Sequence, residues 1–115
     1  MLNVTRGNVP QTPIVPPSLG RVSDIEVQDN PARHQFELLV DGEQAGLAAY
    51  RERDGVVTVT HSEVDRRFRG QGLANELARR TLDQLRERGV KVVPMCPFFA
   101  RYVGEHHEYD DIIVD

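Results

Sequence analysis

Two arginines and two glycines at close spacing form the segment best suited to hold a phosphate. Arg67, Arg69, Gly70 and Gly72 lie between a β-rich segment ending near Val64 and a helical segment. A turn from a strand into a helix directs free backbone N–H groups to one point, where the helix dipole adds positive charge. Glycine permits close approach of a ligand, and arginine neutralises phosphate. The pattern predicts a diphosphate site; the alternative is a plain strand-to-helix turn with solvated arginines.

The single cysteine, Cys96, is the second residue with chemical potential. It follows a predicted strand and precedes Pro97, a residue typical of the first turn of a helix. The positive end of a helix favours the thiolate, which predicts a nucleophilic cysteine. The alternative is a small buried apolar residue, as free cysteine often is.

A histidine and a glutamate form the third candidate. His61 and Glu63 lie two residues apart in a predicted strand, and regular alternation places both on the same face as Val57 and Val59. Either side chain is a candidate general base, acting directly or through water. The alternative is a polar edge of the sheet.

The elements that position these residues begin with four strands in a meander. Alternating or β-branched runs predict strands at residues 25–28, 36–40, 43–51 and 56–64. Asp41-Gly42 is a strong signal for a tight hairpin, and a further turn is predicted at Arg53-Asp54-Gly55.

Helical periodicity starts after the phosphate turn. Apolar residues recur every three or four positions up to a stop at Gly89, which predicts a helix from Gly72 to Arg88. A fifth strand at residues 91–95 and a second helix at 97–105 follow, and residues 110–115 form either a short strand or a frayed end. The helical crossover allows the fourth and fifth strands to run parallel.

Length and composition limit the classes of protein. The 115 residues form one domain, with a disordered proline-rich tail predicted at 1–21 and a folded domain at 22–115. A net charge of -4 argues against a general nucleic-acid binder, and one cysteine favours a reducing, cytoplasmic setting. No apolar run suits a membrane helix, and the adjacent His106 and His107 lack the spacing of a metal site.

The residues from Arg67 to Ala74 resemble the acetyl-CoA diphosphate motif of the GNAT N-acetyltransferase superfamily, written Q/R-x-x-G-x-G/A. Segments 61–64, 92–98 and 106–109, with Tyr102, are similar in this order to its short YjdJ-type branch, which lacks N-terminal helices. The resemblance covers residues 22–109. It implies an α/β fold whose mixed sheet opens between the fourth and fifth strands, with acetyl-CoA lying in the opening.

The resemblance also implies site residues. Those expected to bind the cofactor are Val64, Arg67, Phe68, Arg69, Gly70, Gln71, Gly72, Leu73 and Ala74. The pantetheine arm would pair with the strand backbone near Val64, and the thioester would point toward Cys96. Tyr102, on the helix after the fifth strand, is a candidate for protonating the CoA thiolate; the alternative is packing of its ring in the core.

The function predicted on this basis is transfer of an acetyl group from acetyl-CoA to a small amine, a peptide N-terminus or a lysine. Cys96, Glu63, His61 and Tyr102 are the catalytic candidates. One alternative is a sensor or accessory module that binds acyl-CoA with little catalysis, and another is a nucleotide-binding domain unrelated to CoA. A monomer or weak homodimer that binds neither nucleic acid nor membrane is expected.

Overall fold

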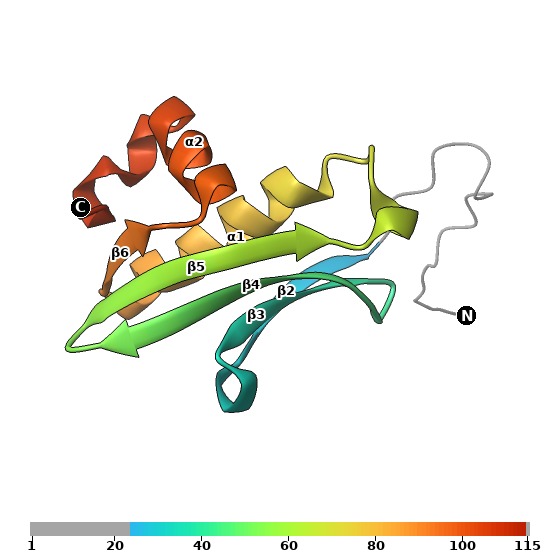
Figure 1. Ribbon diagram of the computed structural model, residues 1–115, viewed down its shortest axis with the longest axis horizontal. Helices are drawn as coiled ribbons and strands as arrows, with labels where there is room; N and C mark the ends of the chain where they lie inside the picture. The colour runs from blue at the N-terminus through green and yellow to red at the C-terminus, as the bar shows by residue number, and fades with distance from the viewer. Residues whose placement is uncertain (1–23, 115) are drawn as a thin grey trace, which may run out of the picture.

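A five-stranded sheet forms the centre of this computed structural model, which describes residues 24–114 (Figure 1). The predicted tail, 1–21, lies outside the described residues. The strands lie side by side in chain order: β2 (Ile25–Asn30), β3 (Gln35–Val40), β4 (Glu43–Arg53), β5 (Val56–Val64) and β6 (Lys91–Pro94). The first four are antiparallel, which confirms the predicted meander.

The two hairpins follow from their turn residues. Asp41 and Gly42 have φ values of 52° and 85°, and Asp54 and Gly55 have 54° and 79°. Two successive residues with positive φ form the tight turn whose twist matches that of the flanking strands. The predicted positions of both turns are confirmed.

The sheet opens between β5 and β6. These strands are parallel, joined by helix α1 (Leu73–Arg88), and their pairing runs only from Val56–Lys91 to Val59–Pro94. Pro94 ends β6 because it has no N–H to donate. The Cys96 N–H bonds to the Val59 carbonyl at 2.8 Å, and the chain then turns into helix α2 (Pro97–Glu105). The second half of β5 is therefore left without a strand on this side, as predicted.

Helix α1 lies across one face of the sheet, behind β4 and β5 in Figure 1. Its apolar positions include Leu77, Leu82 and Leu85, which are fully buried in one cluster with residues such as Phe36 and Val59. Burial of each such side chain contributes roughly 2 kcal/mol to folding. This packing holds α1 against the sheet.

The C-terminal residues differ from the prediction. A 3-10 helix, η5 (His107–Ile112), is followed by a single parallel bridge from Ile113 to Val92. The prediction of a short strand or a frayed end was therefore wrong for residues 110–112, whereas Ile113 and Val114 pair with Val92 of β6 as a short strand would. The physical reason is tertiary, since Tyr109 is buried and its hydroxyl donates to Asp83 of α1 at 2.7 Å.

A bulge in β5 changes the direction of its side chains. Ala49 pairs with His61 but the next residue, Tyr50, pairs with Val59, so Thr60 is an extra residue in the ladder. An extra residue interrupts the strict alternation of a strand. Tyr50 and Val59 are buried on the α1 side, whereas His61 is exposed on the other side.

The predicted common face for His61, Glu63 and the two valines is therefore wrong. His61 and Glu63 point away from α1, and Ser62 and Val64 take the α1 side instead. Sequence alternation alone does not reveal this inversion, because it depends on the pairing of β5 with β4.

Candidate cofactor site

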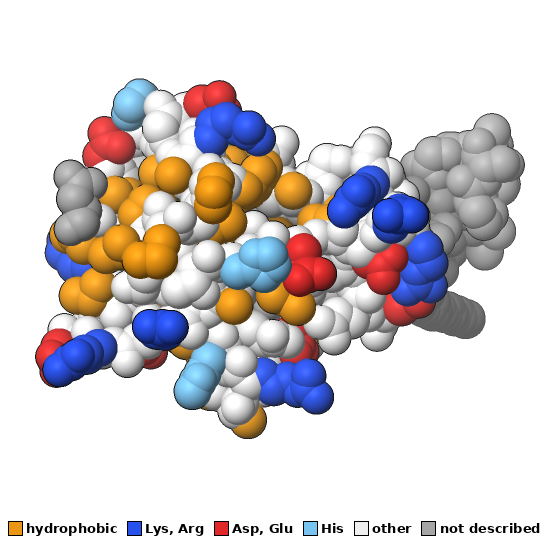
Figure 2. Space-filling view, in the orientation of Figure 1, with side chains coloured by type: hydrophobic (Ala, Val, Ile, Leu, Met, Phe, Trp, Pro, Cys, Tyr) orange, Lys and Arg blue, Asp and Glu red, His pale blue; other side chains and the backbone are white. Residues whose placement is uncertain are grey.

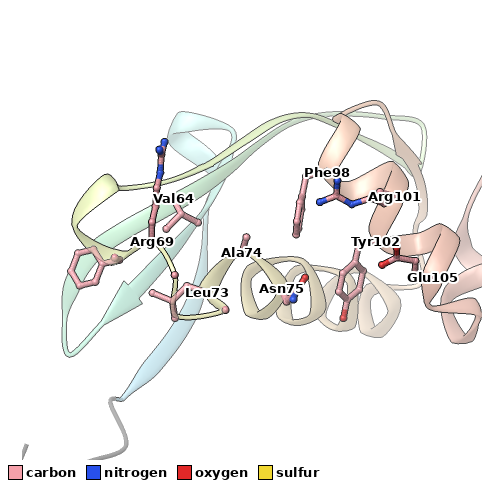
Figure 3. Close-up of a pocket in the computed structure, with 12 residues that line it drawn as sticks. Val64, Arg69, Leu73, Ala74, Asn75, Phe98, Arg101, Tyr102 and Glu105 are labelled. Carbon is pink, nitrogen blue, oxygen red and sulfur yellow. The ribbon is translucent and has the colours of Figure 1, made fainter. Parts of the chain in front are cut away.

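A cavity of about 330 Å³ lies between the start of α1 and helix α2 (Figure 3). Seven of the nine predicted cofactor-binding residues line it: Val64, Phe68, Arg69, Gly70, Gly72, Leu73 and Ala74. Asn75 completes this wall, and α2 supplies Phe98, Arg101, Tyr102 and Glu105. The prediction placed neither Asn75 nor most of the α2 wall in the site, because that wall meets the turn only through the fold.

The turn before α1 is shaped by local bonds. Asp65 begins a short 3-10 helix, η4 (Arg66–Phe68), and its carboxylate accepts the Arg67 N–H at 2.8 Å. This bond and the nearby Arg67 guanidinium lower the pKa of Asp65. Gly70 and Gly72 then have φ values of 83° and 73°, which glycine adopts without strain. The two glycines are needed for the path of the backbone as well as for close approach.

The start of α1 offers unbonded backbone donors. Gly72 is its N-cap, no side chain among residues 24–114 caps the helix, and the first helical bond runs from the Glu76 N–H to the Gly72 carbonyl at 3.3 Å. The N–H groups of Leu73, Ala74 and Asn75 precede that bond and have no acceptor within the helix. Together with the helix dipole, they form a site suited to an anion.

The acidic residue in the first turn of α1 is paired with arginines of the same helix. Glu76 bonds to Arg80 at 2.9 Å and to Arg79 at 2.8 Å. These bonds, from Arg80 first, lower the pKa of Glu76 despite its partial burial. The two arginines thus neutralise the Glu76 carboxylate, so this carboxylate does not cancel the positive potential at the start of α1.

The two arginines predicted to hold phosphate differ. Arg69 lines the cavity, and within residues 24–114 its side chain makes neither a hydrogen bond nor an ion pair. Arg67 lies outside the lining and bonds to Glu43 at 2.8 Å and to Asp65 at 3.3 Å, which raises the pKa of Arg67. Gln71 also lies outside the lining. Of these two arginines, Arg69 is therefore the one whose charge is available to a ligand in the cavity.

Tyr102 presents a protonated hydroxyl to the cavity. Its ring stacks on His106 with centroids 3.8 Å apart, and it points toward α1 near Asn75 in Figure 3. Burial raises the pKa of Tyr102, so the hydroxyl stays protonated at neutral pH. No hydrogen bond of this hydroxyl is found within the described residues. It is thus free to donate to a ligand.

Cys96 lies beyond the inner end of the cavity. It is the N-cap of α2, is 3% exposed, and its Sγ is 3.1 Å from the Ser62 Oγ. Neither Ser62 nor Cys96 lines the cavity. Val64 and Phe98, which follow them by two positions in β5 and α2, do line it. Sequence reasoning missed Ser62, because only the β5 bulge turns it toward Cys96.

His61 and Glu63 form an exposed pair on the opposite face of the sheet. His61 Nε2 and Glu63 Oε2 are 2.9 Å apart, with side chains 61% and 60% exposed. Figure 2 shows a histidine beside an acidic side chain over β5. Tyr102 and the turn before α1 thus line the same cavity, whereas the His61–Glu63 pair lies outside it.

Two further kinds of site were sought in the described residues. Residues 24–114 contain no group of three or more His, Cys, Asp or Glu side chains placed to hold a metal ion. None of the helices in the same residues is long and apolar enough to cross a membrane.

Comparisons with known proteins agree with this architecture. Residues 35–112 match the family model described as GCN5-related N-acetyl-transferase. Protein NATD1 from Mus musculus is 30% identical over 93 residues, covering 79% of this chain and 84% of that protein. Protein NATD1 from Xenopus tropicalis is 32% identical over 91 residues, covering 77% and 84%.

A solved structure shows the same fold. It is the NMR structure of a GCN5-like putative N-acetyltransferase from Staphylococcus aureus, similar to this chain with a TM-score of 0.59 and 20% identity. The similarity covers 77% of this chain and 87% of the other. The YjdJ-type branch named from the motifs stays a prediction.

Proposed function

The chain belongs to the GCN5-related N-acetyltransferase family, and we propose that it binds acetyl-CoA between α1 and α2 and acetylates an amine. The observation that supports this most strongly is the uncapped start of α1 beside Arg69 on the wall of one cavity. Three backbone N–H groups, a helix dipole and a guanidinium that makes no ion pair within the described residues match the charge and the acceptor oxygens of a diphosphate.

The pantetheine arm of the cofactor is assigned to the open half of β5. No residue of β6 pairs with β5 beyond Val59, so the backbone there has hydrogen-bonding groups for an extended ligand. An added extended segment gains main-chain bonds as an added strand does. This direction carries the thioester from the turn toward Ser62 and Cys96.

The transfer itself needs a proton donor at sulfur. The amine nitrogen attacks the thioester carbonyl, the C–S bond breaks, and the thiolate takes a proton as it leaves. Tyr102 is the proposed donor because its hydroxyl is protonated and lies in the cavity. The amine must also lose a proton. We assign the removal of this proton to the His61–Glu63 pair, which would act through water on the face of the sheet opposite to α1.

A covalent route through Cys96 is also proposed. The Cys96 sulfur would attack the thioester carbonyl as the C–S bond to CoA breaks, and the proton of the Cys96 thiol would pass to the CoA sulfur. The amine would then attack the acetyl-Cys96 carbonyl, the new C–S bond would break, and the proton lost by the amine would return to the Cys96 sulfur. The Ser62 hydroxyl at 3.1 Å would hold the sulfur in place. Because Cys96 is the only cysteine, any acetyl-thioester found on the protein identifies it.

The test of cofactor binding is a thermal shift with acetyl-CoA, CoA and ATP, on the wild type and on Gly70→Asp. The variant places a carboxylate at the anion site, and we expect it to abolish a CoA-selective rise in Tm. Equal shifts with ATP would instead favour a nucleotide-binding domain. CoA binding without transfer to any of a panel of amines would favour an acyl-CoA sensor or accessory module.

The covalent route is tested by intact-protein mass spectrometry after brief exposure to acetyl-CoA. We expect an acid-stable adduct of one acetyl group that hydroxylamine removes and that Cys96→Ala lacks. Full turnover by Cys96→Ala without any trapped adduct would leave direct transfer as the mechanism.

A further inference from the structure

Arg101 lies on the α2 wall of the cavity beside Tyr102, and the proposed chemistry does not use its charge. Its Cζ lies 5.4 Å from the centroid of the Phe98 ring, and Figure 3 shows the guanidinium beside that ring. An aromatic face attracts a guanidinium without neutralising it. The ring thus holds the guanidinium at the cavity wall with its charge available to a ligand.

The arginines of α1 provide the contrast. All four bond to carboxylates: Arg79 and Arg80 to Glu76, Arg86 to Asp111, and Arg88 to Asp29. Within residues 24–114, the Arg101 side chain makes neither a hydrogen bond nor an ion pair, even with Glu105, the acidic residue of its own wall. A cation that these residues leave without an acid at a cavity wall indicates a ligand with an anionic group at that point.

The position of Arg101 identifies the part of the ligand that meets it. The proposed function places the diphosphate at the start of α1 and the thioester sulfur at Tyr102, the residue after Arg101. The diphosphate is thus assigned to the opposite wall, whereas the acyl group, one bond from the sulfur, lies on the α2 side. An acetyl group carries no charge for a guanidinium to bind. An acyl chain that ends in a carboxylate supplies this charge.

We propose that the cavity accepts, besides acetyl-CoA, an acyl-CoA whose acyl group ends in a carboxylate, such as malonyl-CoA or succinyl-CoA, and that Arg101 binds this carboxylate. The inference rests on the proposed function, which assigns the thioester to this wall. A guanidinium matches a carboxylate with two parallel N–H donors. In a succinyl group, three C–C bonds of about 1.5 Å separate the carboxylate from the thioester carbonyl, so the two ends reach neighbouring residues of one helix.

The transfer step is the same as for an acetyl group, and the carboxylate is unchanged by it. The nitrogen of the neutral amine attacks the thioester carbonyl, the C–S bond breaks, and the CoA sulfur takes a proton from Tyr102. The amine gives up one proton through the His61–Glu63 pair, which balances the proton gained by the sulfur. The amide formed carries a negative charge on its acyl chain, so this modification reverses the charge of a cationic acceptor, whereas acetylation only removes it.

Calorimetric titration with succinyl-CoA and butyryl-CoA tests the assignment, because the two acyl chains have equal numbers of carbons and differ in the terminal carboxylate. We expect the wild type to bind succinyl-CoA roughly tenfold more tightly than butyryl-CoA, as for an exposed charge-assisted contact. Arg101→Ala is expected to bind both ligands with the affinity that the wild type has for butyryl-CoA. Arg101→Lys keeps the charge without the paired donors and should retain part of the preference.

Two other arginines provide the controls. Arg69→Ala removes a cation assigned to the diphosphate, which both ligands share, so it should weaken both equally and keep the preference for succinyl-CoA. Arg66 is exposed in η4, lies outside the cavity lining, and its side chain makes neither a hydrogen bond nor an ion pair in the described part of the chain. Arg66→Ala should therefore keep the preference too. Loss of the preference in either control would show a general charge effect and overturn the assignment.

Other results separate this inference from the proposed function. Equal binding of the two ligands by the wild type, or a preference that survives in Arg101→Ala, would overturn the inference, while binding of acetyl-CoA would still support the proposed function. Failure of acetyl-CoA and of both longer ligands to bind the wild type would overturn both. Circular dichroism of each variant checks that its fold is intact.

Mass spectrometry of a panel of amines incubated with the wild type and succinyl-CoA measures the transfer itself. We expect succinylated amines, and fewer of them with Arg101→Ala at the same donor concentration. Transfer from acetyl-CoA without any transfer from succinyl-CoA would overturn this inference and leave the proposed function in place.

Discussion

The two ends of α1 use charged and aromatic side chains in opposite ways. At the C-terminal end, Arg88 bonds to Asp29 at 2.7 Å and Arg86 bonds to Asp111 at 2.8 Å. These bonds join α1 to the first strand and to the C-terminal segment. At the N-terminal end, the cavity-facing Arg69 makes no ion pair within residues 24–114, and no side chain of those residues caps the helix.

The tyrosines follow the same division. Tyr50 donates to Asp29 and Tyr109 donates to Asp83, each at 2.7 Å. The hydroxyl of Tyr102, which lines the cavity, makes no hydrogen bond within the described residues. The arginines and tyrosines near the C-terminal end of α1 thus bond to other parts of the protein. Near the N-terminal end, the cavity-lining arginine and tyrosine side chains can bond to a ligand. Substitutions at the two ends should therefore change different measurements.

The largest expected effect is on stability, at the C-terminal end. Arg88→Ala removes the ion pair with Asp29, whose side chain is only 13% exposed, and a guanidinium 5.3 Å from the Phe36 ring centroid. We expect a loss of about 2 kcal/mol in the free energy of unfolding, measured by urea denaturation, because a poorly solvated carboxylate loses its cation. The Kd for CoA should not change.

Arg53→Ala is the control for this variant. Its ion pair with Asp54 is 3.9 Å long and both side chains are 92% exposed. Exposed pairs contribute little, so the control is expected to match the wild type. If Arg88→Ala were as stable as the wild type, the ion pair at the C-terminal end of α1 would not stabilise the fold, and the contrast between the two ends would be wrong.

A smaller effect, on binding alone, is expected at the N-terminal end. Arg69→Ala should weaken CoA binding roughly tenfold, or about 1.4 kcal/mol, without changing unfolding, because no protein carboxylate loses its partner. Arg67→Ala should weaken binding less, since Glu43 and Asp65 already compensate that charge. Titration calorimetry measures both. A greater loss of affinity in Arg67→Ala would reverse the assignment of the two arginines.

The smallest effect is a dependence of stability on alkaline pH. Burial, followed by the hydrogen bond to Asp29, raises the pKa of Tyr50 from 10.0 to about 12. A raised folded-state pKa means that this contribution is complete below pH 10 and is lost as the pH rises through 12. At pH 10.5 the loss from Tyr50 should be under about 1 kcal/mol.

Urea unfolding at pH 8 and pH 10.5 measures this dependence. Only one of the 14 basic residues is a lysine, so few cations titrate in this range. Tyr50→Phe should be less stable at pH 8 and should lose less on going to pH 10.5. An equal pH-dependent loss in Tyr50→Phe and the wild type would assign the effect to other groups.

The sequence by itself determined most of the elements and the glycine-containing turn before α1. The predicted bounds of β5 and α2 agree with the structure at both ends, as do the turns at Asp41-Gly42 and Asp54-Gly55. These features depend on alternation, helical periodicity and the backbone preferences of glycine and proline, all of which act over a few residues. Seven cavity residues could be predicted because the resemblance to a known motif names them, and they lie close together in the sequence between Val64 and Ala74.

Only the tertiary structure decided which side chains meet. Arg67 is compensated by Glu43, which lies 24 positions earlier, and Ser62 meets Cys96 across 34 positions. The β5 bulge turned His61 and Glu63 away from the cavity, and the wall carrying Arg101 came from α2. Strand register and helix docking are set by packing of the whole core, so local spacing cannot predict them.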